Sequence, residues 1–146
     1  MFLDIKQIND HLVDIFNRIL VIEENSLKVS QFSDVSLKEM HTIEIIGKSD
    51  RVTPSDIARE LLLTLGTVTT SLNKLEKKGY IERTRSEQDR RVVYLSLTSK
   101  GRLLDRLHGK FHRNMVKHIT EGMDESEVET LGRGLSNLYT FLEELM

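Results

Sequence analysis

A stretch of small polar and basic side chains recurs at helical spacing near the middle of the sequence. If Val68, Leu72 and Leu75 form the inner face of a helix, a rotation of roughly 100° per residue turns the residues between them outward. The outward group consists of Gly66, Thr67, Thr70, Asn73, Lys74 and Lys77. Small residues let a helix enter a major groove about 12 Å wide, where Thr and Asn can hydrogen-bond base edges and lysines can meet phosphates. The pattern favours contact with duplex DNA.

A charged segment flanked by β-branched and aromatic residues follows this helix. Residues 80–84 and 92–97 have the composition of two short strands, and the polar stretch 85–91 between them predicts a hairpin with a charged tip. We expect Asp89 to orient a neighbouring arginine rather than to touch anionic DNA. A minor groove favours arginine because of its negative potential, and the tip offers it Arg85, Arg90 and Arg91.

Helix start and stop signals locate the elements that would position these groups. Polar caps and capping boxes stand at Ser36 with Glu39, Thr53 with Pro54 and Asp56, Thr64, Thr98, and Asp124 with Glu127. Helices are expected to stop at Gly47, Gly79 and Gly122. The predicted order is a helix over 5–22, an irregular segment over 25–35, three helices that begin after Ser36, Thr53 and Thr64, the hairpin, and two helices that begin after Thr98 and Asp124.

This order predicts a mainly α fold with one small hairpin (α+β), and specifically a winged helix-turn-helix. We expect one domain over 1–146, with its DNA-binding part at 36–98. The first helix and the last two helices carry long apolar stripes that a monomer of 146 residues would struggle to bury. An intertwined homodimer formed by residues 1–35 and 99–146 would bury them.

Composition excludes several classes of function. The chain has no cysteine, which excludes a disulfide scaffold, an Fe–S cluster, a Cys-ligated zinc site, a thiol nucleophile and a thiol redox sensor. It also has no apolar run near the roughly 20 residues of a membrane span and no signal peptide, so we expect a cytoplasmic protein. The formal net charge of −2 hides an excess of eight positive charges over residues 74–118, which favours a specific anionic partner.

The chain resembles the MarR family of winged helix-turn-helix regulators over essentially its full length. The resemblance lies in residues 65–69, 75–81 and 89–101, and the Asp-x-Arg pair of the family's wing corresponds to Asp89 and Arg91. It implies a homodimer that reads a pseudo-palindromic operator. The expected DNA-binding residues are Thr53, Thr64, Gly66, Thr67, Thr69, Thr70, Asn73, Lys74, Lys77, Arg83, Arg85, Gln88, Asp89, Arg90 and Arg91.

Within the family, residues 39–43, 64–72 and 85–93 are similar to MarR-type repressors of fatty-acid synthesis genes. That resemblance implies a corepressor, a long acyl chain on acyl carrier protein. Candidate residues for an acyl pocket are Ile19, Ile22, Leu27, Met40, Ile43, Phe111 and Met115. Candidates for docking the acidic carrier protein are Arg102, Arg106, Lys110, Arg113 and Lys117. The alternative is a MarR-type regulator that a small aromatic or lipophilic ligand releases from DNA.

Two other classes are less well supported. His108 and His112 stand four residues apart, as in some metal sites, but no Glu follows the first in a His-Glu-x-x-His pattern, so we expect solvated histidines, no metal and no enzyme. Neither a Gly-x-Ser-x-Gly motif nor a phosphate loop is present, which leaves no catalytic residue to name. A winged protein-interaction module without DNA is disfavoured by the basic, small-residue face of residues 66–77.

Overall fold

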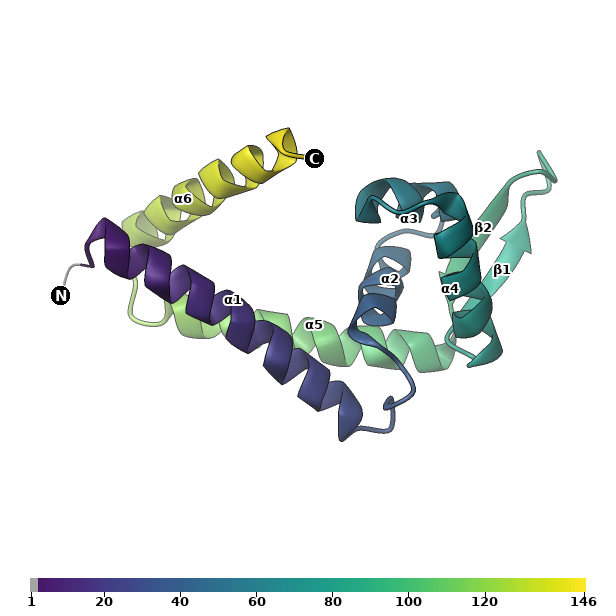
Figure 1. The fold of residues 1–146 in the computed structure, drawn as a ribbon, viewed down its shortest axis with the longest axis horizontal. Coiled ribbons are helices and arrows are strands. Elements are labelled where there is room, and N and C mark those ends of the chain that lie inside the picture. The colour runs from purple at the N-terminus through teal and green to yellow at the C-terminus, as the bar shows by residue number, and fades with distance from the viewer. Residues whose placement is uncertain (1–2) are drawn as a thin grey trace.

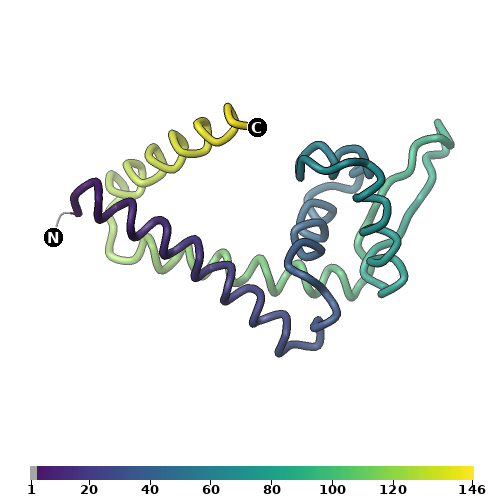
Figure 2. The backbone as a smooth tube through the Cα atoms, in the orientation of Figure 1, coloured from purple at the N-terminus to yellow at the C-terminus, as the bar shows by residue number. Residues whose placement is uncertain are grey.

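The computed structural model describes residues 3–146, and Figures 1 and 2 show the course of the chain. Within these described residues, six helices and two strands follow one another in the predicted order: α1 (Ile5–Lys28), α2 (Leu37–Gly47), α3 (Pro54–Leu61), α4 (Leu65–Lys77), β1 (Ile81–Arg85), β2 (Val93–Leu97), α5 (Ser99–Thr120) and α6 (Glu125–Glu144). The predicted mainly α winged fold is confirmed. In Figure 1 the winged part, α2 to β2, lies at one end, and α1, α5 and α6 extend away from it.

Local side-chain hydrogen bonds begin the helices where the sequence predicted. Ser36 and Glu39 form a reciprocal capping box at α2, and Asp124 with Glu127 forms another at α6. Thr53 caps α3, with Pro54 at its first turn. These bonds satisfy backbone N–H groups that a helix end leaves without partners, so they need no distant residue.

The wing is a two-stranded antiparallel hairpin attached to the helices on both sides. Ile81 pairs with Leu97 and Arg85 with Val93. The hairpin is also bonded to the segment before α3, because Val52 forms an isolated antiparallel bridge with Leu95 of β2. The Thr98 hydroxyl donates to the Gly79 carbonyl oxygen, which ties the start of α5 to the end of α4.

The apolar core lies mainly where α2, α3, α4 and the hairpin meet. Val68, Leu72 and Leu75 of α4 are buried in it, as predicted, so the opposite face of α4 is turned outward. Gly101 lets α5 approach closely, because a Cβ there would collide with the Tyr80 carbonyl oxygen. The outward face of α4 is therefore supported from behind by a packed apolar core.

Three local predictions are wrong. Helix α1 does not end near residue 22 but continues to Lys28, so residues 25–28 are helical rather than irregular. Gly47 is the last residue of α2 and not a stop beyond it; its hydrogen leaves room for the Asp105 carboxyl of α5. Helical spacing also predicts Leu62 on the inner face of the helix that begins after Thr53, together with Ile57, Ala58 and Leu61. Leu62 is instead the exposed cap of α3, in the left-handed conformation at φ 53°.

The long helices leave much of their apolar surface uncovered. Exposed side chains include Ile5, Ile8, Leu12 and Phe16 on α1, Val116 and Ile119 on α5, and Leu135, Tyr139 and Leu142 on α6. None of the α6 residues that the structure describes is buried. Over residues 3–146, no helix combines the length and the apolar character that crossing a bilayer requires.

Candidate nucleic-acid interface

Helix α4 presents the polar face that the sequence predicted. Its residues expected to bind DNA are all exposed: Gly66, Thr67, Thr69, Thr70, Asn73, Lys74 and Lys77. The exposed lysines stand in the last turn, where cations also complement the negative end of the helix dipole. Apart from Leu65, the exposed side chains of the first two turns are small, which lets the backbone of α4 approach a groove closely.

The first turn of α4 is organised by threonines. Thr64 caps the helix by accepting from the backbone N–H of Thr67 at 3.2 Å, and the two hydroxyls lie 2.8 Å apart. The Thr70 hydroxyl donates to the Gly66 carbonyl oxygen at 3.0 Å. These bonds hold the threonine side chains in place. The remaining backbone N–H groups of the first turn point out of the helix start, as in any α-helix, where a phosphate would be favoured. Thr53, also predicted at the interface, is half-buried and caps α3.

Arg83 connects the wing (β1 and β2) to α4. From β1 its guanidinium donates to Asn73 Oδ1 at 2.9 Å and pairs with Glu76 Oε1 at 3.0 Å, both on α4. Because Asn73 Oδ1 already accepts from Arg83, the amide nitrogen of Asn73 is left to donate outward. Arg83 was predicted to contact DNA; the structure places it between β1 and α4, where it orients Asn73.

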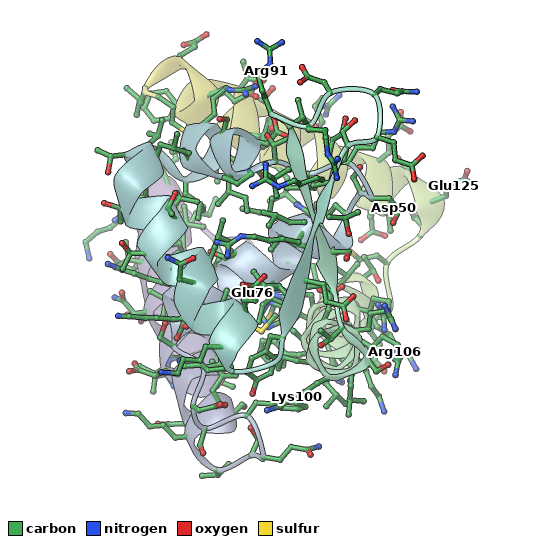
Figure 3. The ribbon with its side chains drawn as sticks, turned by 90° about the vertical axis from the view of Figure 1, so that its right-hand side faces the viewer. Asp50, Glu76, Arg91, Lys100, Arg106 and Glu125 are labelled. Carbon is green, nitrogen blue, oxygen red and sulfur yellow. The ribbon has the colours of Figure 1, made fainter. Side chains whose placement is uncertain are left out.

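The tip of the wing holds Arg91 in a fixed direction. Asp89 accepts two hydrogen bonds from the Arg91 guanidinium, at 3.1 and 3.2 Å, so it orients that arginine as predicted. These bonds from Arg91 lower the pKa of Asp89, which keeps the pair ionised. Figure 3 shows Arg91 at the far end of the hairpin, with Glu76 on α4 beside the strands. Arg85, Gln88 and Arg90 are exposed on the same tip.

A partly buried ion pair holds the C-terminal end of α4 in place. Lys78 Nζ lies 3.1 Å from both carboxylate oxygens of Glu39 and also donates to the Asp34 carbonyl oxygen. The Tyr80 hydroxyl donates to Asp34 Oδ1 at 2.6 Å, and Lys100 lies 4.4 Å from the centre of the Tyr80 ring. Burial, reinforced by Asp34, raises the pKa of Tyr80, so its hydroxyl remains a donor. The end of α4 is thereby joined to α2 and α5.

A cavity of about 220 Å³ lies between α1, α2 and α5, where the acyl pocket was predicted. Of the seven predicted lining residues, Leu27, Met40 and Phe111 line it. Ile43 is instead in the core, Ile19 and Met115 are half-buried elsewhere, and Ile22 is exposed. The residues that sequence reasoning missed are Glu23, Ser26, Ser30, Phe32, Leu104, Leu107 and His108.

The five basic residues proposed for carrier-protein docking follow one side of α5. Arg102, Arg106, Lys110, Arg113 and Lys117 recur every three or four residues and are all exposed. Such spacing places them on one face of a helix. Arg102 is held at the start of this row, because its guanidinium donates to the Leu97 carbonyl oxygen at 2.8 Å and to the Ser99 hydroxyl at 3.3 Å.

His108 and His112 of α5 are not the solvated pair that the sequence predicted. The His108 side chain is only 9% exposed, its Nε2 lies 3.0 Å from Glu44 Oε2, and His112 Nε2 lies 3.1 Å from Glu23 Oε1. The signal for this pairing is Glu23 itself, because it stands four residues from Ile19 and from Leu27 and so lies within the apolar stripe of α1.

Comparison with known proteins agrees with this architecture. The MarR family model matches residues 35–93. A crystal structure of Streptococcus pneumoniae FabT in complex with DNA is similar to this chain, with a TM-score of 0.88 and 62% identity over 98% of this chain and 100% of that one. The uncharacterized HTH-type transcriptional regulator YfiV of Bacillus subtilis is 32% identical over 111 residues, 75% of this chain and 69% of that protein.

A second Bacillus subtilis relative, the HTH-type transcriptional regulator PchR, is 30% identical over 92% of this chain and 85% of its own length. The matches therefore extend from the winged part into the long helices. Together with the exposed face of α4 and the arginine-bearing wing, they show that the chain belongs to the MarR family and is a DNA-binding transcription regulator rather than an enzyme.

Proposed function

We propose that this regulator represses genes of fatty-acid biosynthesis, and that a long acyl chain presented on acyl carrier protein is its corepressor. The observation that carries the proposal is the 62% identity with Streptococcus pneumoniae FabT over nearly the whole chain. It adds to the resemblance of residues 39–43, 64–72 and 85–93 to MarR-type repressors of fatty-acid synthesis.

The cavity between α1, α2 and α5 supports an acyl ligand. Its walls are largely apolar, with Leu27, Met40, Leu104 and Phe111 among them. Its volume of about 220 Å³ lies below the roughly 300–1,000 Å³ of sites for drug-sized ligands, which suits a narrow alkyl chain. The flexible thioether of Met40 can adapt to such a chain.

The basic row of α5 supports an acidic carrier. Its five exposed cations form a continuous positive face, and Leu104, Leu107 and Phe111 of the same helix line the cavity. Leu104 and Phe111 stand roughly on the opposite side of α5 from the basic row, so the acyl group of a carrier seated there would have to pass around the helix, beside the half-exposed Leu107, to enter the cavity. Complementary charge of this kind steers association and fixes orientation.

The uncovered apolar faces of α1, α5 and α6 support a homodimer. We propose that residues 1–35 and 99–146 intertwine with a second copy and that residues 36–98 bind DNA, in the cytoplasm. The two copies of α4 would then read half-sites of a pseudo-palindromic operator about 34–36 Å apart. Of the fifteen residues proposed above, Arg83 and Asp89 would act by orienting Asn73 and Arg91. A corepressor must bind the dimer conformation that has this spacing more tightly than any other conformation. A typical coupling free energy of about 1–3 kcal/mol corresponds to a 5- to 150-fold gain in affinity for the operator.

The test is the affinity for an operator selected from random DNA, measured with and without carrier protein loaded with a long acyl chain. We expect the loaded carrier to tighten operator binding at least about fivefold, and the carrier without an acyl chain to leave it unchanged. Leu107→Trp, which would fill the cavity, should abolish the response. Weaker binding, or no change with the loaded carrier, would remove the corepressor while leaving DNA binding intact.

A second cavity favours the alternative of release by a small ligand. It measures about 260 Å³ and lies between α2, α3 and α4, with Ile57, Leu61, Thr67 and Ser71 in its wall. A small aromatic or lipophilic molecule placed there would touch the recognition helix directly. Operator affinity that falls on addition of such a molecule, and does not respond to the loaded carrier protein, would favour this function.

A further inference from the structure

Three ligand-type side chains from α1 and α5 converge on one point beside the first cavity. The Nε2 atoms of His108 and His112 are 2.9 Å apart, and Glu23 Oε1 lies 3.1 Å from His112 Nε2 and 3.9 Å from His108 Nε2. The side chains of Glu23 and His108 are only 5% and 9% exposed, whereas that of His112 is 41% exposed. The cluster is therefore closed on the protein side and open to solvent beside His112.

Ordinary hydrogen bonding explains this arrangement poorly. A neutral imidazole has one N–H, which can be directed at one acceptor. His108 Nε2 nevertheless faces three groups, namely His112 Nε2, Glu23 Oε1 and, at 3.0 Å, Glu44 Oε2. Two protonated imidazoles would direct like charges at one another across 2.9 Å. The atoms share one centre instead of forming separate pairs.

We propose that Glu23, His108 and His112 form a binding site for a divalent transition-metal ion, with zinc as the best match. Three atoms separated by 2.9, 3.1 and 3.9 Å lie on a circle with a radius of about 2.0 Å, which agrees with the roughly 2.0–2.2 Å of Zn–N and Zn–O bonds. Imidazole and carboxylate are ligands that zinc accepts readily, and histidines four apart on a helix can share one ion.

The open side gives the ion its fourth position. A zinc ion with three protein ligands binds water or a further donor there. Glu44 of α2 is the neighbouring carboxylate, in contact with His108 at 3.0 Å. The ion would join α1 to α5 through residues that also line the cavity, because Glu23 and His108 belong to its wall. Metal occupancy would thus stiffen the junction between the long helices.

The experiment measures zinc binding by the full-length protein, free of any polyhistidine tag, by titration calorimetry against a competing chelator. We expect one ion per chain. Glu23→Gln and His112→Gln should each lower the affinity at least about tenfold. The matched control is His118→Gln, since this α5 histidine is exposed and lies 3.6 Å from the exposed Glu121, outside the cluster; its affinity should equal that of the unchanged protein.

Two further readouts do not depend on DNA or acyl ligands. Cobalt(II) added to the protein should show the intense visible absorption of a four-coordinate ion, and the His112→Gln variant should lose it. Zinc at about 100 times its dissociation constant should raise the melting temperature by at least about 5 °C in the unchanged protein only. The proposal is overturned if no ion binds, or if Glu23→Gln and His112→Gln, shown to be folded by circular dichroism, bind zinc as tightly as His118→Gln.

Discussion

The winged region (residues 36–98) and the helical region (residues 5–35 and 99–146) differ in how they bury their apolar residues. Of the 17 buried apolar residues among those described, 13 lie in the winged region, although the helical region is the longer of the two. The remaining four are Leu27, Phe32, Val35 and Leu104, all close to the winged region. The apolar stripes farther along α1 and α6 face solvent in the single chain.

The winged region is stabilised by a core within its own chain, whereas the helical region depends on surface that the single chain leaves exposed. The winged region contains its own core, so the face of α4 is held rigidly whether or not a second copy is present. The helical region buries only these four apolar side chains and leaves long apolar stripes exposed, so we expect a partner surface to supply much of its stability. DNA recognition and dimer formation can therefore be perturbed separately.

The largest effect is expected from a cavity in the winged core. Leu72→Ala removes a fully buried side chain of α4 and should cost about 2–5 kcal/mol of unfolding free energy. Leu65→Ala is the matched control on the same helix, because Leu65 is half exposed, and it should cost less than about 1 kcal/mol. Urea denaturation measures both values, and equal losses would contradict an internal core behind α4.

The second prediction concerns the helical region. Leu135→Asp places a charge on the exposed apolar face of α6 and should raise the dimer dissociation constant at least tenfold, or about 1.4 kcal/mol, in analytical ultracentrifugation. Thr140→Asp adds the same charge on the opposite side of α6 and should leave the constant unchanged. If Leu135→Asp also leaves it unchanged, α6 is not part of the dimer interface.

The third prediction tests the wing without touching either core. Arg91→Ala should weaken operator binding about fivefold at moderate salt and lower the salt dependence by roughly one phosphate contact. Lys6→Ala removes an equally exposed cation from the far end of α1 and serves as the control. Identical salt titrations for Arg91→Ala and the unchanged protein would exclude Arg91 from the interface.

The smallest effect is expected where the two regions meet. Burial, and then the nearby charge of Glu44, raises the pKa of Asp105, so the folded state loses stability as pH rises and this carboxyl ionises. Asp105→Asn should therefore stabilise the protein at neutral pH, by less than about 1 kcal/mol after solvent screening, and have no effect at pH values below the ordinary pKa of Asp.

Asp56 provides the contrast of opposite sign within the winged region. Its pKa is lowered, first by the hydrogen bond from the Thr53 backbone, so the ionised form stabilises the fold above the ordinary pKa of Asp, and this stability is lost as pH falls through the lowered value. Asp56→Asn should destabilise the protein at neutral pH. Urea denaturation at several pH values compares the two variants, and the same sign for both would contradict these assignments.

Much of the fold was predictable because its signals are short in range. A capping side chain bonds a backbone group three residues away, so Ser36, Thr53, Thr64, Thr98 and Asp124 mark helix starts without reference to the rest of the chain. The outward face of α4 follows from helical geometry once Val68, Leu72 and Leu75 are taken as its inner side. The orientation of Arg91 by Asp89 was predictable for the same reason, since the two residues are neighbours at the tip.

Contacts between distant segments were not predictable in this way. Only three of the seven residues predicted for the acyl pocket line the cavity, because periodicity shows which side of a helix is apolar and not which neighbour that side meets. Ile43, predicted for the pocket, lies in the core instead. Phe32 and Leu104, which were not predicted for the pocket, line the cavity. The bond between Arg83 and Asn73 likewise depends on how the wing packs against α4.

The sequence by itself determined the order of the elements, their starting residues and the polar face of α4, because each depends on interactions within a few residues. Only the tertiary structure decided that Glu23 meets His108 and His112, that α1, α2 and α5 enclose a cavity, and that no α6 side chain is buried by residues 3–146 of the same chain. Those results depend on how two long helices cross, and the crossing is set by packing between residues some 85 positions apart.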